Sequence, residues 1–185
     1  VVEVETHASK GLPAIVIIGD VSRVVDEAKD RLRASFTNSD LLIPKKRITI
    51  NIAPADIKKD DSGLDLAIAT SLLLSSGQIR QSADLDKTIF IGELGLEGGV
   101  KNGRGIIGKI IYAKKLGYQK FIIPSESLNQ AKVIPEATLL PIATLRELYM
   151  HLTQTVVIKP LLTSSEPVKD RPLPPNYVDF SEVAG

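Results

Sequence analysis

The sequence predicts a mixed α/β domain of the α+β class, followed by an extended carboxyl-terminal segment. Extended and helical patterns alternate up to about residue 153, and one central helical stretch is apolar on almost every side. Helical periodicity then disappears, and five prolines fall between residues 154 and 185. We therefore expect one folded domain over residues 1–153 and a proline-rich linker over residues 154–185.

The first part of the chain predicts two strands and an amphipathic helix. Residues 2–6 and 14–18 are rich in Val and Ile, as is typical of strands. Between residues 21 and 36 the apolar side chains recur at helical spacing, and Asp20 is placed to cap the amino terminus of this helix. The charged residues of the same helix are expected to form a solvated face.

Residues 47–69, RITINIAPADIKKDDSGLDLAIA, are the most informative stretch. Its isoleucines alternate with polar residues from position 47 to 52, which predicts a half-buried strand that ends at Pro54. Ser62 and Asp65 have the spacing of a capping box, so Ser62 is predicted to be the N-cap of the next helix. That helix, residues 64–74, is apolar around its circumference and is therefore expected to be central.

The remainder of the domain continues the alternation. The predicted elements are a strand at 88–94, a tight turn at 97–99, a helix at 106–116 that Gly117 ends, a strand at 121–123, a short helix from Ser125, a strand at 139–142 and a second capping box at Thr144 and Glu147. This order predicts that strands and helices pack in layers around one core.

Composition excludes several functional classes. The chain has no cysteine, so disulfides, thiolate catalysis and zinc–thiolate sites are excluded. Its formal charge of +1 argues against a dedicated nucleic-acid-binding domain, although local basic clusters remain. No apolar run approaches the length of a membrane span and no signal peptide is visible, so we expect a cytoplasmic protein without membrane contact. The chain begins at Val1 rather than Met, which leaves open an upstream strand or address.

Three blocks of this sequence together resemble a known family. RITINIAPADIKK, DLAIA and GELGLEGGVKNGRGI resemble the amino-terminal domain of bacterial magnesium-chelatase-like AAA+ ATPases, the ComM-type competence proteins, which are grouped with the D and I components of Mg chelatase. The resemblance extends from about residue 2 to the end of the chain. It implies a ribosomal protein S5 domain 2-like fold, shared with the Lon protease proteolytic domain, ahead of an AAA+ ATPase domain. Residues 177–185 resemble the segment that leads into that ATPase domain.

The resemblance also implies a function. The family is similar to hexameric branch-migration helicases of homologous recombination and natural transformation. We therefore expect a non-catalytic accessory domain that contributes to assembly or DNA contact, with its own AAA+ domain, further subunits of a hexamer and DNA as partners. No cofactor is expected in this part of the chain, whereas the downstream ATPase domain would bind ATP and magnesium. A Lon-like Ser/Lys peptidase and a pure oligomerisation scaffold remain as alternatives.

The comparison with Lon-type proteases predicts that the catalytic dyad is absent. On the shared pattern, Gly63 occupies the position of the nucleophilic serine and Ile107 that of the lysine. Ser62 and Lys109 lie close in sequence but out of register, so they form only an alternative dyad. Because two residues on a helix rotate a side chain by about 200°, Lys109 is predicted to point away from the face that carries Ile106, Ile107, Ile110 and Ile111.

The segment from Gly103 to Lys109 matches the spacing of a phosphate-binding P-loop. A functional P-loop needs Ser or Thr after the lysine to hold magnesium, and this chain has Ile110 there. The upstream residues 99–103 form a turn sequence rather than a buried strand. The match is therefore predicted to be accidental.

Of the remaining charged residues, the aspartates and histidines are assigned no chemical role, and two basic clusters are assigned a DNA contact. Asp56, Asp60, Asp61 and Asp65 cluster around the predicted helix start, where the helix dipole explains them without a metal. His7 and His151 have no partner motif. The nucleic-acid candidates are the tight basic clusters Lys45, Lys46 and Arg47, and Lys58 and Lys59.

Overall fold

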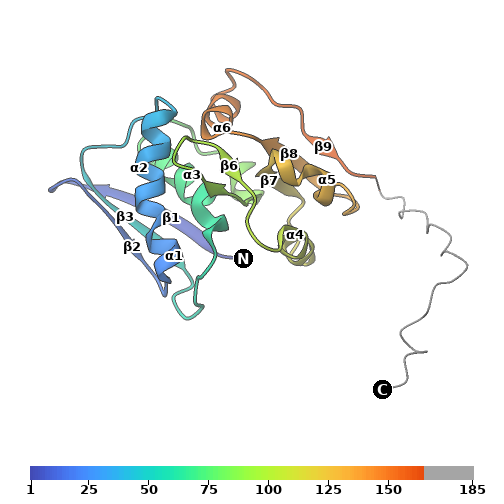
Figure 1. The fold of residues 1–185 in the computed structure, drawn as a ribbon, viewed down its shortest axis with the longest axis horizontal. Helices are drawn as coiled ribbons and strands as arrows, with labels where there is room; N and C mark the ends of the chain where they lie inside the picture. Colours follow the sequence, from blue (N-terminus) through green and yellow to red (C-terminus); the bar gives the residue numbers. More distant parts are fainter. Residues whose placement is uncertain (165–185) are drawn as a thin grey trace, which may run out of the picture.

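The computed structural model describes residues 1–164. It shows a mixed α/β architecture with a three-stranded sheet, a four-stranded sheet and a two-stranded hairpin (Figure 1). The expected α+β class is therefore confirmed. No helix among the described residues is long and apolar enough to cross a membrane.

The first sheet has the strand order β1-β3-β2. β1 (Glu3–Ser9) runs antiparallel to the central strand β3 (Arg47–Ala53), and β2 (Ala14–Ile18) runs parallel to it. The alternating isoleucines of β3 are buried, whereas Arg47 at its start is exposed. The two-residue period predicted for this strand is confirmed.

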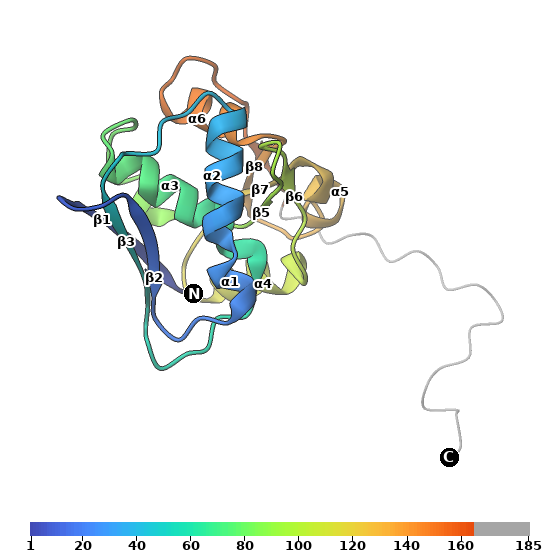
Figure 2. The ribbon, with the colours of Figure 1, turned by 60° about the vertical axis from the view of Figure 1, so that its left-hand side comes forward.

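Three helices stand on one face of this sheet (Figure 2). They are α1 (Arg23–Asp26), α2 (Ala28–Asn38) and α3 (Asp65–Ser75). The single helix predicted at 21–36 is wrong in detail, because it starts later and is divided at Glu27. Asp20 and Ser22 instead hydrogen-bond through their backbones to Lys59, so residue 22 is the N-cap position and Asp20 caps nothing.

The second sheet has the order β4-β7-β8-β9. Its strands are β4 (Thr88–Phe90), β7 (Lys120–Pro124) and β8 (Thr138–Ile142), which are parallel, and the antiparallel β9 (Leu161–Leu162). It packs with α4 (Ile106–Lys115), α5 (Leu128–Ala131) and α6 (Leu145–Leu152). The buried side chains of this half form a second apolar cluster around Phe121.

A short hairpin connects the two halves. β5 (Glu93–Leu94) pairs with β6 (Val100–Lys101). The continuous strand predicted at 88–94 is interrupted because the chain changes partners: Ile91 N–H donates to Ile122, and Gly92 N–H donates to Gly63. Two backbone bonds at consecutive residues thus bring the second sheet against the turn that precedes α3.

Thr144 is the N-cap that the sequence predicts, but the reciprocal bond from Glu147 reaches the residue before it. Thr144 Oγ1 accepts from Glu147 N–H at 3.1 Å, while the Glu147 carboxylate accepts from Ala143 N–H at 2.8 Å. Both bonds satisfy backbone donors at the start of α6.

The segment after α6 contacts the domain at a few points. Ile158 N–H donates to His151 Nδ1 at 3.1 Å, β9 adds to the second sheet, and Thr163 is only 7% exposed. The predicted linker is thus attached to the domain at Ile158, β9 and Thr163, while most of its residues between 154 and 164 are exposed. The rest of the predicted linker, including residues 177–185, lies outside the described residues.

One buried ion pair joins the helices to the hairpin. Arg31 on α2 donates from Nε and Nη2 to the two carboxylate oxygens of Asp65, at 2.6 and 2.9 Å. Leu94 N–H donates to the same carboxylate at 3.0 Å. The Asp65 side chain is 1% exposed, so this contact ties α2, α3 and β5 together away from solvent.

Burial raises the pKa of Asp65 above its ordinary value, and the hydrogen bonds from Arg31 and Leu94 offset part of that rise. Removing only the guanidinium would leave a buried carboxyl group with one remaining donor. Such a loss is costly because the desolvation of the carboxylate is no longer compensated.

We predict that Arg31→Leu lowers the free energy of unfolding by about 3–5 kcal/mol. The double variant Arg31→Leu/Asp65→Leu should lose less, since it leaves only the Leu94 N–H without an acceptor. Urea denaturation followed by circular dichroism measures both. Arg33→Leu is the control, because Arg33 also lies on α2 but pairs with Asp30 at the exposed surface. A loss no greater than that of Arg33→Leu would contradict the role of this pair.

Candidate functional site

The turn at residues 61–64 is fixed by Asp61 rather than by Ser62. Asp61 has an extended backbone, and its carboxylate accepts from Gly63 N–H at 2.7 Å at the start of a short 3-10 helix, Ser62–Leu64. Ser62 Oγ instead donates to the Glu93 carboxylate. The predicted Ser62–Asp65 capping box is therefore wrong, because Asp61 reaches the free N–H first and Asp65 binds Arg31.

Lys109 lies directly against this turn. Its ammonium nitrogen is buried and forms an ion pair with the Asp61 carboxylate. A Cβ atom placed on Gly63 would lie 3.0 Å from Lys109 Nζ and 2.9 Å from Asp61 Oδ1. Glycine is thus the residue that leaves space for the pair.

The prediction that Lys109 points away is wrong. The buried face of α4 carries Ile106, Ile110 and Ala113, while Ile107 is 38% exposed. Lys109 follows Ile106 by three residues and precedes Ala113 by four, so it shares this buried side of the helix. The structure therefore brings together Gly63 and Lys109, rather than Gly63 and Ile107.

The backbone that precedes α4 also packs on the turn. A Cβ on Gly103 would lie 3.4 Å from the Gly63 Cα. Two glycines therefore face each other where the loop after β6 meets the turn before α3. Within this contact the Gly63 position supplies no hydroxyl, and the neighbouring Ser62 hydroxyl is hydrogen-bonded to Glu93.

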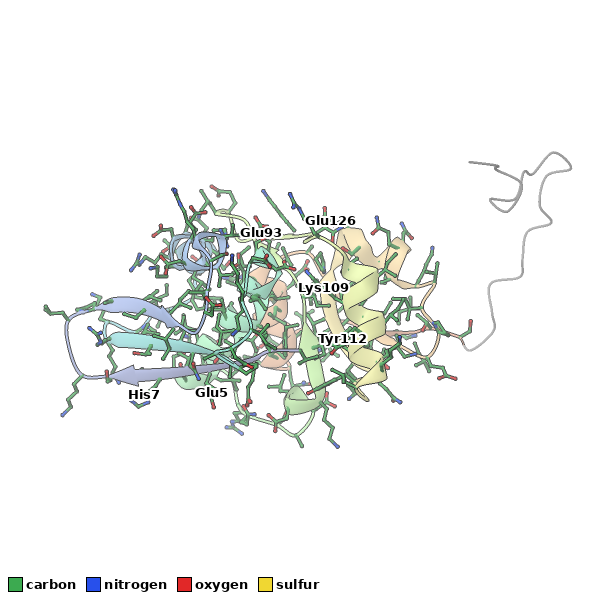
Figure 3. The ribbon with its side chains drawn as sticks, turned by 90° about the horizontal axis from the view of Figure 1, so that it is seen from below. Glu5, His7, Glu93, Lys109, Tyr112 and Glu126 are labelled. Carbon is green, nitrogen blue, oxygen red and sulfur yellow. The ribbon has the colours of Figure 1, made fainter. Side chains whose placement is uncertain are left out.

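A groove of about 1280 Å³ opens beside the turn. Side chains of β1, α3, β4 and α4 line it, and Asp61, Gly63 and Lys109 lie at its wall. Figure 3 shows Lys109 and Tyr112 on the side of α4 that faces the first sheet, with Glu93 across from Lys109. Apolar residues make up much of its lining, and polar residues such as Glu3, Ser71 and Asp86 lie along it as well.

The structure agrees with the rejection of a P-loop. The two-residue strand β6 precedes the loop and pairs antiparallel with β5, so no buried parallel strand feeds it. Gly105 caps α4 in a left-handed conformation, with φ 66° and ψ 32°, and no side chain caps the helix. Asn102 N–H donates to the Glu126 carboxylate, an anion that would repel a phosphate at the same place.

The predicted nucleic-acid residues fall in different environments. Lys45, Lys46 and Arg47 are exposed at the loop that leads into β3, and Lys58 is exposed in the loop after it. Lys59 is wrong as a candidate, because it is 4% exposed and its ammonium donates to the Pro54 carbonyl. The backbone bridge of Lys59 to Val21 buries its side chain against the domain.

The acidic residues around the turn do not converge. Asp56 and Asp60 are exposed, Asp61 pairs with Lys109, and Asp65 pairs with Arg31. Over residues 1–164 no group of three or more His, Asp or Glu side chains is placed to hold a metal ion. His7 is exposed on β1, and partial burial lowers the pKa of His151.

Sequence reasoning missed two members of this site. The sequence places Arg31 on the solvated face of its helix, and it places Glu93 only within a strand. The helical spacing carried a signal for Arg31, since it follows the buried Ala28 by three residues and precedes the buried Ser35 by four. No comparable signal identified Glu93, because its contact with Ser62 joins segments 31 residues apart.

The domain is thus of the α+β class, and its turn at Gly63 lies between the ion pairs Asp61–Lys109 and Arg31–Asp65, at the edge of a groove. Comparison with known proteins identifies its family. The family model described as subunit ChlI of Mg-chelatase matches residues 4–127. The chain belongs to this family.

Several curated proteins are similar to the chain. It is 35% identical over 135 residues to the competence protein ComM of Haemophilus influenzae, a match covering 73% of this chain and 26% of ComM. It is 38% identical over 133 residues to the uncharacterized protein YifB of Escherichia coli, covering 72% of this chain and 26% of YifB. It is also 30% identical over 91 residues to the DNA repair protein RadA of Streptococcus pneumoniae, covering 49% and 21%.

The chain spans only part of these proteins. It corresponds to 36% of the length of the first curated relatives and to about a quarter of ComM and YifB. The similarity to ComM and YifB supports a ComM-type Mg-chelatase-like protein.

We predict that a fluorophosphonate probe does not label this protein. The Ser62 hydroxyl donates to the Glu93 carboxylate, which is a weak base, and the Lys109 ammonium pairs with Asp61, so the lysine of a Ser/Lys dyad does not act on this serine. Gel fluorescence against an active serine hydrolase at equal concentration makes the measurement. Labelling at Ser62 that disappears in Lys109→Ala would establish the alternative dyad.

Proposed function

We propose that this domain is a non-catalytic accessory domain of a longer ComM-type AAA+ ATPase that acts on recombining DNA. The observation that carries the proposal is the turn itself. Gly63 takes the place where a nucleophile would stand beside a buried lysine, and Asp61 holds that lysine as an ion pair. The Lys109 ammonium is thus directed at a carboxylate, and the Gly63 position offers no hydroxyl for it to activate.

The proposal also assigns the fold to the ribosomal protein S5 domain 2-like group that includes the Lon proteolytic domain. The support is the approach of Lys109 on α4 to the turn that precedes the buried helix α3, which is the pair of segments that the sequence resemblance set side by side. ATP binding and hydrolysis are assigned to another part of the full-length protein, since the loop before α4 lacks the features that hold phosphate.

The role in DNA metabolism rests on relatives and on local charge. The curated relatives include a competence protein and a DNA repair protein. In this chain, Lys45, Lys46 and Arg47 are exposed together, and none of them belongs to the ion pairs found within residues 1–164. Three phosphate contacts give weak binding to one domain, so we propose that a hexamer in the cytoplasm presents several copies to the same DNA.

The scaffold alternative differs from this proposal in a measurable way. A domain that serves only assembly would leave DNA affinity unchanged when its exposed cations are reversed. A domain that contacts DNA loses both affinity and salt dependence, because each neutralised phosphate releases counterions.

We predict that reversal of Lys45, Lys46 and Arg47 to Glu weakens DNA binding by the full-length protein. The slope of log affinity against log salt concentration should fall by about 2–3, in line with about 0.9 per lost phosphate contact. Fluorescence anisotropy with labelled duplex DNA at several salt concentrations measures it.

The matched control reverses Arg80, Lys87 and Lys115, three exposed cations that the proposal leaves out of the contact. It changes the charge of the domain by the same amount. Equal losses in both triple variants would indicate a general charge effect, and an unchanged slope in the first variant would favour the scaffold.

A further inference from the structure

The turn between β1 and β2 carries an exposed leucine close to the basic residues of the proposed DNA contact. Leu12 is 88% exposed, the largest exposure among the large apolar side chains in the described part of the chain. It lies between Lys10 and Pro13 in this turn. Single exposed leucines are common on protein surfaces, so the surroundings of Leu12 decide whether it has a role.

Backbone pairing places this turn beside the basic loop that leads into β3. Ser9 at the end of β1 and Ala14 at the start of β2 are both in register with Arg47. Ala14 N–H donates to the Lys46 carbonyl at 3.3 Å, and a Cβ on Gly11 would lie 3.5 Å from the Arg47 Cβ. Lys10 and Leu12 thus belong to the same end of the sheet as Lys45, Lys46 and Arg47.

This end of the sheet, residues 9–13 and 44–47, is here called the basic tip. It contains four cations and no acidic residue. None of the four takes part in the ion pairs found within residues 1–164. Figure 1 shows the tip at the far left of the first sheet, away from the helices that cover it. The positive charge of the tip is complementary to a polyanion such as DNA. Leu12 protrudes from the same tip and is accessible to such a ligand.

We infer that Leu12 is an apolar wedge for DNA, entering between bases where the duplex is branched or open. Lys10, Lys45, Lys46 and Arg47 hold the phosphates on either side. Apolar side chains of this size are inserted between base steps by other DNA-binding proteins, and the cost of unstacking is lowest where pairing is already broken. The inference rests on the DNA contact proposed above and adds to it the residue that would distinguish branched from linear DNA.

The geometry of the turn suits this role. Pro13 fixes its own φ and restricts the backbone of Leu12 before it, so the wedge position has limited conformational freedom. The flanking strands β1 and β2 are each paired with β3. A wedge on such a support loses less conformational entropy on insertion than one on a long loop.

The test compares a four-way DNA junction with a linear duplex of the same arms, using the full-length protein and the variants Leu12→Ser and Leu96→Ser. Leu96 is also an exposed leucine, 57% exposed, in the turn between β5 and β6. We expect Leu12→Ser to weaken junction binding by about tenfold, as expected for the loss of one buried leucine, while duplex binding stays within about twofold. Leu96→Ser should change neither.

A second readout detects insertion directly. A 2-aminopurine base at the branch point should gain fluorescence with the unmodified protein, because unstacking relieves quenching, and this gain should be lost with Leu12→Ser. Unchanged thermal unfolding of Leu12→Ser confirms that the fold is intact.

The outcomes separate the two proposals. If the protein binds duplex and junction equally, or if Leu12→Ser leaves both the preference and the fluorescence unchanged, the wedge is wrong while the DNA contact stands. If neither DNA is bound at low salt, or if reversal of the basic cluster has no effect on either, the DNA contact itself is wrong. Loss of junction preference with retained duplex binding supports the wedge.

Discussion

The buried contact between Arg31 and Asp65 is the constraint on which the rest of the structure depends. It joins α2 and α3, and through Leu94 N–H it fixes the start of the hairpin. Asp65 follows the turn at Gly63 by only two residues. The contact that fixes this carboxylate therefore also fixes the position of the turn. The chain that leads from the second sheet binds to this turn through the hydrogen bond from Gly92 N–H to the Gly63 carbonyl.

The second ion pair, between Asp61 and Lys109, explains why the groove has a charged corner without a reactive group. Asp61 serves two donors, the Gly63 N–H and the Lys109 ammonium, and α4 is thereby attached to the first half of the domain. The Lys109 ammonium, which a Ser/Lys hydrolase would need beside its serine, is paired with Asp61 instead. The surface available for a partner thus lies elsewhere, and the basic tip is at the opposite end of the first sheet from α4 (Figures 1 and 2).

Much of the fold could be predicted from the sequence, because its strands and its central helix follow clear periods. The alternating isoleucines of β3 and the all-round apolar character of α3 required no knowledge of tertiary contacts. The site could be predicted only in part. Asp61 and Ser62 are both capable caps, and spacing alone does not decide which one reaches the Gly63 N–H first. The position of Lys109 depended on which face of α4 is buried, and the apolar residues at 106, 107, 110 and 111 allowed two answers. The burial of Lys59 arises from a long-range bridge to Val21, for which the local sequence gives no signal.

The central claim is that DNA contacts the basic tip and that the turn at Gly63 is structural. Titration of ¹⁵N-labelled protein with a short duplex, followed by amide chemical shifts at low salt, tests it most directly. The account predicts that shifts concentrate at Lys10, Leu12 and residues 45–47, while Gly63, Gly103 and Lys109 remain unchanged. Shifts that concentrate instead at Gly63, Gly103 and Lys109 would contradict it, because they would place the DNA in the groove beside the turn.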